Sequence, residues 1–180
     1  MNWILTEIDG KVASIAADYR YLASIAARLA AHSPDAVDRV STRKISTDEL
    51  QSLEATLSWD DLCPFGSKFQ KSVWKVLFDL THPRENPTLL SYTDFAERCG
   101  NPQGVRAVAH AVAMNPIAYV IPCHLIVPKE SIDRVREIRR SAEATLFRGS
   151  DLYLLDTIDV GEYAWGPEQK RELIKLQLLK

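Results

Sequence analysis

The sequence predicts an α/β protein, with a small N-terminal hairpin-plus-helix module followed by a mostly helical C-terminal domain of the winged helix-turn-helix type. Two observations carry this prediction. An Asp-Gly pair separates two apolar runs near the N-terminus, and Ser or Asn residues that can cap helices precede most of the later apolar segments. With 180 residues, of which 46% are hydrophobic and 26% charged, the chain can bury a core as one domain or as two small ones.

A β-hairpin is expected at the N-terminus. The pair Asp9-Gly10 lies between the apolar runs 3–8 and 11–16. Asp and Gly tolerate the positive φ angles of a two-residue hairpin turn, and the flanking β-branched residues favour strands. Residues 3–16 are therefore predicted to form two antiparallel strands.

Two helices are expected after the hairpin. Residues 19–31 are rich in Ala and Leu and contain neither Pro nor Gly, which predicts an amphipathic helix that ends at Ser33-Pro34. Ser46 can cap a second helix that extends through Leu57. The turn-forming sequence at 60–66 then marks the expected boundary. The two predicted domains are residues 1–62 and residues 63–180.

The second domain is expected to begin with a buried helix. Ser67 can cap it, and five apolar side chains at helical spacing predict one face that packs in the core. The aromatic members of this face are expected to pack inward rather than to stack on bases. The five residues are Phe69, Val73, Trp74, Leu77 and Phe78.

A pair of helices joined by a tight turn follows. Ser91 can cap a helix from Tyr92 to Arg98, and Asn101-Pro102 can open another that extends to about residue 114. Two helices connected in this way suggest a helix-turn-helix, whose second helix would present Arg106 near its start to DNA. The same geometry is common in proteins that do not bind DNA, so the pattern alone leaves both interpretations open.

A cysteine followed directly by a histidine is the main candidate for reactivity. Residues 115–122 predict an apolar strand that ends at Cys123-His124. A buried cysteine is usually an inert hydrophobic residue. A thiol reacts as thiolate, and a neighbouring imidazole is one of the groups that can promote that form. Other residues must therefore decide between the two interpretations.

Composition narrows the classes of function. Cys63, Cys99 and Cys123 are odd in number and show no CxxC spacing, which argues against a disulfide framework and a closed zinc site. The net charge is −2, but residues 63–128 carry six basic against four acidic residues, which suits local contact with phosphates. The chain shows no secretory or membrane-spanning segment, so a reducing, cytoplasmic compartment is expected, or the nucleus in a eukaryote.

Five segments of the sequence are informative together. They are Phe69 to Trp74, Ser91-Tyr92-Thr93, Gly100 to Val108, Asn115-Pro116 and Ile121 to His124. In this order and spacing they resemble the O6-alkylguanine-DNA alkyltransferases, with a similarity that is dense over 64–127 and resumes at 163–173. The resemblance implies DNA repair in which an alkyl group passes irreversibly from guanine O6 to the protein's own cysteine, one transfer per molecule, with no metal or organic cofactor. It also implies double-stranded DNA containing O6-alkylguanine as partner and a monomer.

The resemblance assigns roles to individual residues. Cys123 is the implied alkyl acceptor and His124 its water-linked base. Tyr92 is implied to crowd the DNA backbone and to hydrogen-bond the flipped base, and Arg106 to enter the stack in its place. The remaining implied residues are Asn115, which braces the turn before the cysteine, Gln103 and Gly104 on the DNA side, and Tyr163, Ile126 and Ala164 in the guanine pocket.

Four positions depart from the family's pattern. Gln177 falls where a glutamate usually polarises the histidine, and an amide stabilises an imidazolium less than a carboxylate does. We therefore expect weaker activation of the thiol or a substitute carboxylate nearby. Ala164 and Trp165 replace a serine and a glycine of the pocket loop, and Leu125 replaces an arginine.

The largest departure is an insertion at residues 128–162, where the family has a short loop. Residues 131–146 predict a charged helix, and residues 152–158 a strand or short apolar segment. The arginines of that helix are expected to form a solvated face rather than a DNA tether. These arginines are Arg134, Arg136, Arg139 and Arg140.

Two functions from different classes remain open. The first is a suicide alkyltransferase. The second is a module that binds alkylated DNA without repairing it, as a lesion sensor or regulator. A cysteine hydrolase is disfavoured, because neither an Asp or Asn partner nor an oxyanion motif accompanies the Cys-His pair.

Overall fold

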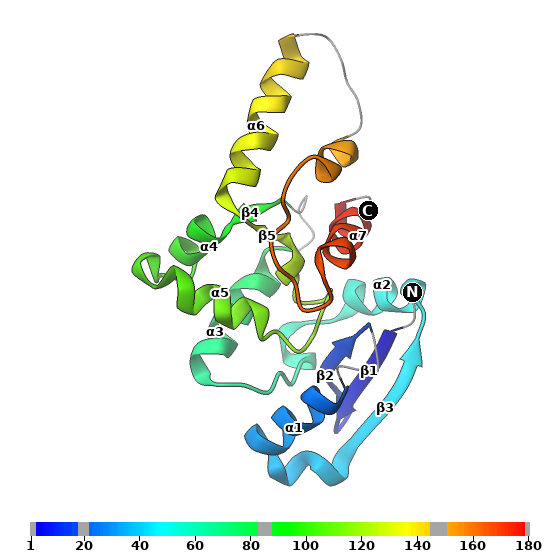
Figure 1. The fold of residues 1–180 in the computed structure, drawn as a ribbon. Helices are drawn as coiled ribbons and strands as arrows, with labels where there is room; N and C mark the ends of the chain where they lie inside the picture. The colour runs from blue at the N-terminus through cyan, green and yellow to red at the C-terminus, as the bar shows by residue number, and fades with distance from the viewer. Residues whose placement is uncertain (1–2, 18–21, 83–87, 145–150, 179–180) are drawn as a thin grey trace. The chain divides into compact units, whose positions relative to one another are not determined.

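A computed structural model describes residues 3–17, 22–82, 88–144 and 151–178, with only the backbone at 22, 139, 141–144 and 151–153 (Figure 1). The predicted α/β class is confirmed. The chain forms two compact units, one of residues 1–79 with 114–121 and one of residues 80–113 with 122–180. The division after residue 62 stays a prediction; in the structure, residues 63–79 belong to the first unit.

No helix in the described part of the chain is both long and apolar enough to span a membrane.

The first unit contains a three-stranded antiparallel sheet in the order β2-β1-β3. The predicted hairpin is confirmed as β1 (Trp3–Ile8) and β2 (Lys11–Ala16), and Asp9 and Gly10 have φ angles of 51° and 77°. Strand β3 (Val40–Ile45) pairs with β1 and was not predicted. Four of its six side chains are exposed, so it lacks the apolar alternation by which a strand is found in a sequence.

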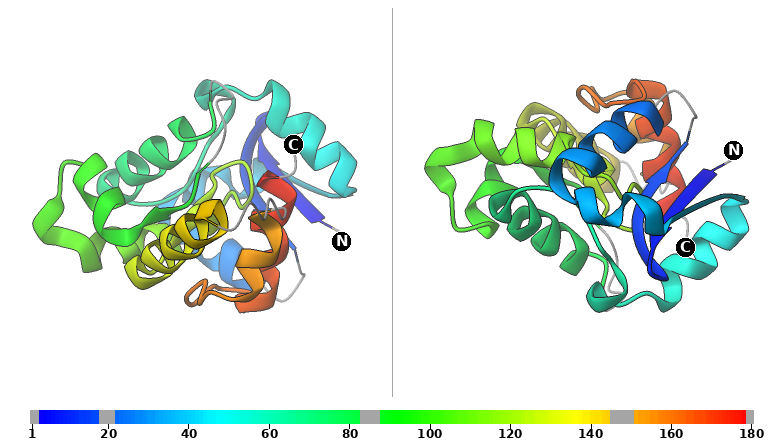
Figure 2. Two further views of the ribbon diagram at one scale, coloured as in Figure 1. Left: turned by 90° about the horizontal axis from the view of Figure 1, so that it is seen from above. Right: turned by 90° about the horizontal axis from the view of Figure 1, so that it is seen from below.

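Helices surround this sheet (Figures 1 and 2). The predicted helix at 19–31 is α1 (Leu22–His32) where the structure describes it, since residues 19–21 lie outside the described part. The predicted Ser46 cap is confirmed, because its hydroxyl accepts a hydrogen bond of 3.1 Å from the backbone N–H of Glu49. The remaining elements in this part of the chain are η2 (Pro34–Arg39), α2 (Thr47–Thr56), η3 (Trp59–Asp61) and α3 (Lys68–Asp79).

Helix α3 buries four of the five predicted residues. Trp74 is completely buried, and its ring packs so closely on Gly66 that a Cβ at Gly66 would lie 2.5 Å from Cη2. The prediction for Phe69 is wrong, because its side chain is 40% exposed. Phe69 lies in the first turn of α3, and the buried face begins one turn later at Val73.

The residues before Cys123 form a tight turn rather than the predicted strand. Single bridges join Ile15 to Ile117 and Ala118 to Ile121, and Tyr119 has a φ of 72°. The main chain folds back so that the N–H of Ile121 donates to the carbonyl of Ile117 at 3.0 Å. An apolar run alone does not distinguish a strand from a buried turn.

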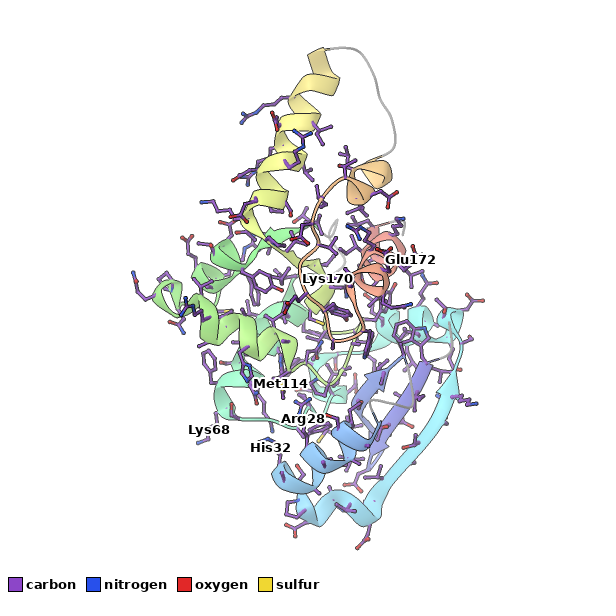
Figure 3. All side chains as sticks on the ribbon, viewed as in Figure 1. Arg28, His32, Lys68, Met114, Lys170 and Glu172 are labelled. Atoms are coloured by element: carbon purple, nitrogen blue, oxygen red, sulfur yellow. The ribbon has the colours of Figure 1, made fainter. Side chains whose placement is uncertain are left out.

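An arginine of α1 supports the start of this turn. Nη2 of Arg28 donates to the carbonyl of Met114 at 2.6 Å, and the guanidinium lies 5.3 Å from the ring centroid of Phe65 (Figure 3). Burial lowers the pKa of Arg28. The contact links α1 to a segment more than eighty residues later in the chain.

The second unit contains the predicted helix pair. Helix α4 (Tyr92–Arg98) packs against α5 (Val105–Ala113), with the short 3-10 helix η4 (Pro102–Gly104) between them. The Ser91 cap is confirmed, since its hydroxyl accepts from the N–H of Asp94 at 3.0 Å. Two short strands, β4 (Leu90–Ser91) and β5 (Ile126–Val127), pair in parallel.

The predicted insertion, residues 128–162, contains helix α6 (Lys129–Ala144) and the 3-10 helix η6 (Asp151–Asp156). The predicted charged helix is present, although residues 145–150 lie outside the described part of the chain. Residues 152–156 are helical, so the strand alternative is wrong; the buried Leu154 and Leu155 are consecutive, which a strand with one buried face does not allow.

The insertion shares a hydrophobic core with helix α7 (Pro167–Leu178) and β5. Arg171 of α7 holds the insertion by donating to the carbonyls of Leu155 at 3.0 Å and Ile158 at 2.8 Å. Among the α6 arginines, Arg134 and Arg136 are exposed and pair with acidic neighbours, as expected for a solvated face; the side chain of Arg139 is outside the described part. The shared core residues are Val127, Ile132, Leu155, Ile158, Val160 and Ile174.

Candidate functional site

Cys123 begins the short 3-10 helix η5 (Cys123–Leu125). The residue is 6% exposed, and its Sγ lies 3.5 Å from Oη of Tyr163. Tyr163 comes from the loop before α7, so two segments forty residues apart meet at the sulfur. The predicted nucleophile and the predicted pocket tyrosine are thus brought together.

His124 and Gln177 are both buried, with exposed fractions of 0% and 2%. They lie on η5 and α7, which pack against each other. A buried imidazole next to the cysteine suits the predicted role of His124 as a base. At Gln177, where the resemblance leads us to expect a glutamate, an uncharged amide occupies an interior position on α7, the helix that packs against η5.

Tyr92 is the first residue of α4 and is half-buried. Burial raises the pKa of Tyr92, and the charges of Cys123 and Glu162 raise it further. The phenol therefore stays protonated at neutral pH and can donate a hydrogen bond. This is the state that its predicted role toward a guanine requires.

The structure adds Lys170, to which the sequence assigned no role. Its side chain is completely buried on α7, facing the rest of this unit, whereas Glu172 lies on the other side of the helix (Figure 3). Nζ donates to the carbonyl of Ile126 at 2.7 Å and lies 5.7 Å from the ring centroid of Tyr92 and 5.9 Å from that of Tyr163. Burial lowers the pKa of Lys170 to about 8.

A signal for Lys170 was present in the sequence. The buried positions of α7 are 170, 173, 174 and 177, which is the spacing of one helical face. A lysine on such a face is rarely buried without a partner. The helical register of α7 could therefore have identified Lys170 as an interior charge.

The predicted pocket residues lie around the same point. Ile126 is buried, and its carbonyl accepts the Lys170 hydrogen bond. Ala164 is exposed beside Tyr163. The Tyr163 ring meets Trp165 edge to face, with centroids 5.5 Å apart. An aromatic side chain thus stands where the family's pattern has glycine.

Asn115 closes the turn that precedes Pro122 and Cys123 in the chain. Its Nδ2 donates to the carbonyl of Ile121 at 2.8 Å, and its Oδ1 accepts from the N–H of Ile117 at 3.0 Å. One side chain therefore binds main-chain groups at both ends of the turn, beside the main-chain bond between Ile121 and Ile117. A residue that braces the turn before the cysteine is expected to form such hydrogen bonds.

The predicted DNA-facing residues lie at the start of α5. Arg106 and Gln103 are exposed, as a DNA contact requires. Gly104 packs against Asn101, and a Cβ at position 104 would lie 2.2 Å from the Asn101 side chain, which would have to move. The part of these residues in DNA binding stays a prediction.

The chemistry of the site is that of a thiol and its neighbours. Within the described residues, no three His, Cys, Asp or Glu side chains are grouped so that they could hold a metal ion. Burial raises the pKa of Cys99 to about 11, which is expected of an unreactive, structural cysteine.

Comparison with known proteins confirms the predicted resemblance. Residues 68–141 match the family described as 6-O-methylguanine DNA methyltransferase, DNA binding domain. A methylated-DNA–protein-cysteine methyltransferase of Methanosarcina barkeri is 34% identical over 96 residues, which are 50% of this chain and 58% of that protein. One from Haemophilus influenzae is 41% identical over 69 residues, or 38% of this chain and 36% of that protein. The matched part of the chain thus spans about half the length of these curated relatives or less.

Solved structures support the fold over nearly the whole chain. The O6-methylguanine-DNA methyltransferase of Pyrococcus kodakaraensis superposes with a TM-score of 0.54 at 22% identity, covering 98% of this chain and 91% of that one. The O6-methylguanine methyltransferase of Mycobacterium tuberculosis gives 0.53 at 19% identity, covering 99% and 94%. The similarity therefore includes residues 1–67, which the family match does not reach.

Proposed function

We propose that this chain, whose residues 68–141 carry a 6-O-methylguanine DNA methyltransferase DNA-binding domain, repairs O6-alkylguanine in DNA by transferring the alkyl group to Cys123. The observation that carries the proposal is the meeting of Cys123, Tyr163, Tyr92 and a buried lysine at one point in the second unit. The relatives named for methyl transfer from DNA to a protein cysteine support it.

The transfer is a displacement at the alkyl carbon. The thiolate sulfur of Cys123 forms a bond to that carbon while the bond from carbon to guanine O6 breaks, and the electron pair stays on the guanine. The guanine then takes up a proton. In this proposal His124 accepts the thiol proton, and Tyr92, kept protonated by its raised pKa, hydrogen-bonds the departing base. A thioether has no easy leaving path, so each molecule acts once.

DNA engagement is assigned to α5. Guanine O6 lies inside the duplex, and the base must be rotated out at an unstacking cost of a few kcal/mol before a protein thiol can reach the alkyl carbon. Arg106 can occupy the vacated stack, because a planar guanidinium both stacks and donates hydrogen bonds. The partner is double-stranded DNA, the acting species is a monomer, and the place of action is the compartment that holds the DNA.

The test is the intact mass of the protein after incubation with duplex DNA that contains O6-methylguanine. A gain of one methyl group on Cys123, absent in Cys123→Ala and with no gain on Cys63 or Cys99, is the expected result. Two or more methyl groups per molecule, or transfer that persists in Cys123→Ala, would contradict the assignment of the acceptor.

Gln177 favours a second candidate. A buried amide stabilises an imidazolium at His124 less than a carboxylate does, so the thiol could be too weakly activated to react. The chain would then bind alkylated DNA as a lesion sensor or regulator. Tight and selective binding of O6-methylguanine DNA with no change in protein mass would establish this function in place of repair.

A further inference from the structure

Arg171 connects α7 to the end of η6. The two elements pack against each other (Figure 1). The side chain of Arg171 is only 18% exposed, and its Nε and Nη2 donate to the carbonyls of Leu155 at 3.0 Å and Ile158 at 2.8 Å. Carbonyls at the C-terminal end of a helix lack partners within that helix. Arg171 therefore supplies hydrogen-bond donors at the point where η6 ends.

The bond to Ile158 fixes the chain five residues before Tyr163. Between these two residues, the hydroxyl of Ser131 donates to the carbonyl of Asp159, and the carboxylate of Asp159 accepts from the N–H of Gly161 at 2.8 Å. Ser131 lies on α6 and Arg171 on α7. Side chains of two helices thus hold the main chain that leads to Tyr163.

The chain after Tyr163 is fixed at the start of α7. The carbonyl of Tyr163 accepts from the N–H of Gly166 at 2.9 Å, and the carbonyl of Gly166 accepts from the N–H of Lys170 at 3.2 Å. Arg171 follows directly and bonds back to Ile158, thirteen residues earlier, so residues 158–171 form a closed loop. Opening this loop would restore conformational freedom to the residues within it, Tyr163 among them.

Tyr163 forms part of the wall around the sulfur. Its Oη lies 3.5 Å from Sγ of Cys123, and its ring contacts that of Trp165. An alkylated guanine must bring its alkyl carbon to about 3–3.5 Å from the sulfur before it can react, so a displaced wall leaves less of the bound base correctly placed. A small reagent that attacks the thiol without a bound base does not depend on the wall in this way.

We propose that Arg171 is a positioning residue, which fixes residues 158–163 through two main-chain carbonyls and thereby holds Tyr163 at Cys123. The proposal rests on the proposed function of Cys123 as alkyl acceptor. It also gives residues 128–162 a part in the reaction, because the groups that hold the pocket loop belong to η6 and α6. This segment then tightens the binding of the guanine.

The first test measures single-turnover benzyl transfer from free O6-benzylguanine at increasing concentrations and, separately, the rate at which iodoacetamide alkylates Cys123. Arg171→Met removes the donors and keeps most of the apolar stem. It is expected to raise the half-saturating concentration of O6-benzylguanine about tenfold without lowering the rate with iodoacetamide. Arg171→Lys keeps the charge and one donor group and should recover part of the loss. An unchanged half-saturating concentration in folded Arg171→Met, or equal falls in both rates, would overturn the proposal.

Lys175→Met is the matched control. Lys175 lies on the same helix and reaches the same segment, but through the exposed carboxylate of Asp156 at 3.2 Å rather than through the main chain. Exposed ion pairs contribute little. Neither the half-saturating concentration nor the rate with iodoacetamide should change by more than about twofold in this variant.

The second test needs no reaction with guanine, so it decides the role of Arg171 even if the unmodified protein transfers no alkyl group and the proposed function fails. The protein is labelled with 5-fluorotryptophan, and the 19F resonance of Trp165, assigned from Trp165→Phe, reports on its neighbour Tyr163. Arg171→Met is expected to move or broaden this resonance and to leave those of the other three of the four tryptophans in place. An unchanged Trp165 resonance would contradict the proposal, and equal shifts of all four would show that Arg171 stabilises the fold without positioning the loop.

Discussion

At the scale of single residues, the site combines groups whose protonation states depend on one another. Tyr92 stays protonated because it is buried near negative charge, and Lys170 is held charged against its burial by the same negative charge. The charge of Cys123 is thus a common cause of both effects on pKa.

Arg106 provides a prediction about base extrusion. Arg106→Ala is expected to slow repair in duplex DNA about tenfold or more while leaving the reaction with free O6-benzylguanine nearly unchanged, since the free base needs no extrusion. Single-turnover rates on the two substrates measure the difference. Arg98→Ala removes the same exposed charge from the neighbouring helix α4 and serves as the control. Equal losses on both substrates would indicate that Arg106 is structural.

Asn115 provides a prediction about stability. Asn115→Ala removes hydrogen bonds at both ends of the 117–121 turn and leaves main-chain groups without their partner. A cost of about 1–3 kcal/mol in the free energy of unfolding is expected. Urea unfolding measures it. A cost below about 0.5 kcal/mol would show that main-chain bonds alone hold the turn.

At the scale of elements, local signals were sufficient for some predictions and insufficient for others. The hairpin and the Ser46 and Ser91 caps were predicted because a turn pair or a cap acts over three or four residues. The turn before Cys123 was mistaken for a strand because its shape depends on the side chain of Asn115 reaching six residues ahead. Strand β3 was missed because its partner β1 lies more than thirty residues away and its own side chains are mostly exposed.

The candidate site shows the same division. Cys123, His124, Tyr92 and Tyr163 were proposed from a resemblance to a family, and the structure brings Cys123 and Tyr163 together. The roles of these four residues stay predictions. Lys170 was not assigned a role, because its burial results from the packing of α7 against β5 and the two tyrosines. The prediction that Phe69 is buried was wrong for another reason. Helical spacing shows which side of a helix packs inward, but not at which turn the buried face begins.

Gly66 provides a prediction about the packing of α3. Gly66→Ala is expected to cost about 1–3 kcal/mol, because its Cβ would lie 2.5 Å from the fully buried Trp74 ring. The midpoint of urea unfolding measures the loss. Ser67→Ala, the adjacent change, removes only a helix cap and is expected to cost about 1 kcal/mol. A smaller loss at Gly66 than at Ser67 would mean that the tryptophan moves aside freely.

At the scale of the whole molecule, the buried charge of Lys170 lowers the stability of the folded protein. The pKa of Lys170 is about 8 in the folded protein and 10.5 in an unfolded chain, so the unfolded state binds more protons between these values and stability rises with pH across that window. Below pH 8 the buried charge reduces stability by about 3 kcal/mol relative to an unshifted lysine.

Lys170→Met is therefore expected to unfold at higher denaturant concentration than the unmodified protein at pH 7, with the difference shrinking between pH 8 and 10.5. Denaturant unfolding of both proteins over pH 6–10.5 measures it, and comparing the two removes the contribution of Cys99, which titrates in the same range. Lower stability of Lys170→Met at pH 7 would mean that its hydrogen bond to Ile126 outweighs the burial of its charge.

The contact between Pro128 and Gly161 brings together the two ends of the segment that contains α6 and η6. A Cβ at Gly161 would lie 3.1 Å from Cδ of Pro128, so this segment leaves and rejoins the chain at the same place. A segment whose ends touch can change in length without displacing either flank, and Cys123 stays in contact with Tyr163 although forty residues separate them in the chain. Removing the segment altogether would, however, expose Val127 and Ile174, because its apolar residues share a core with them.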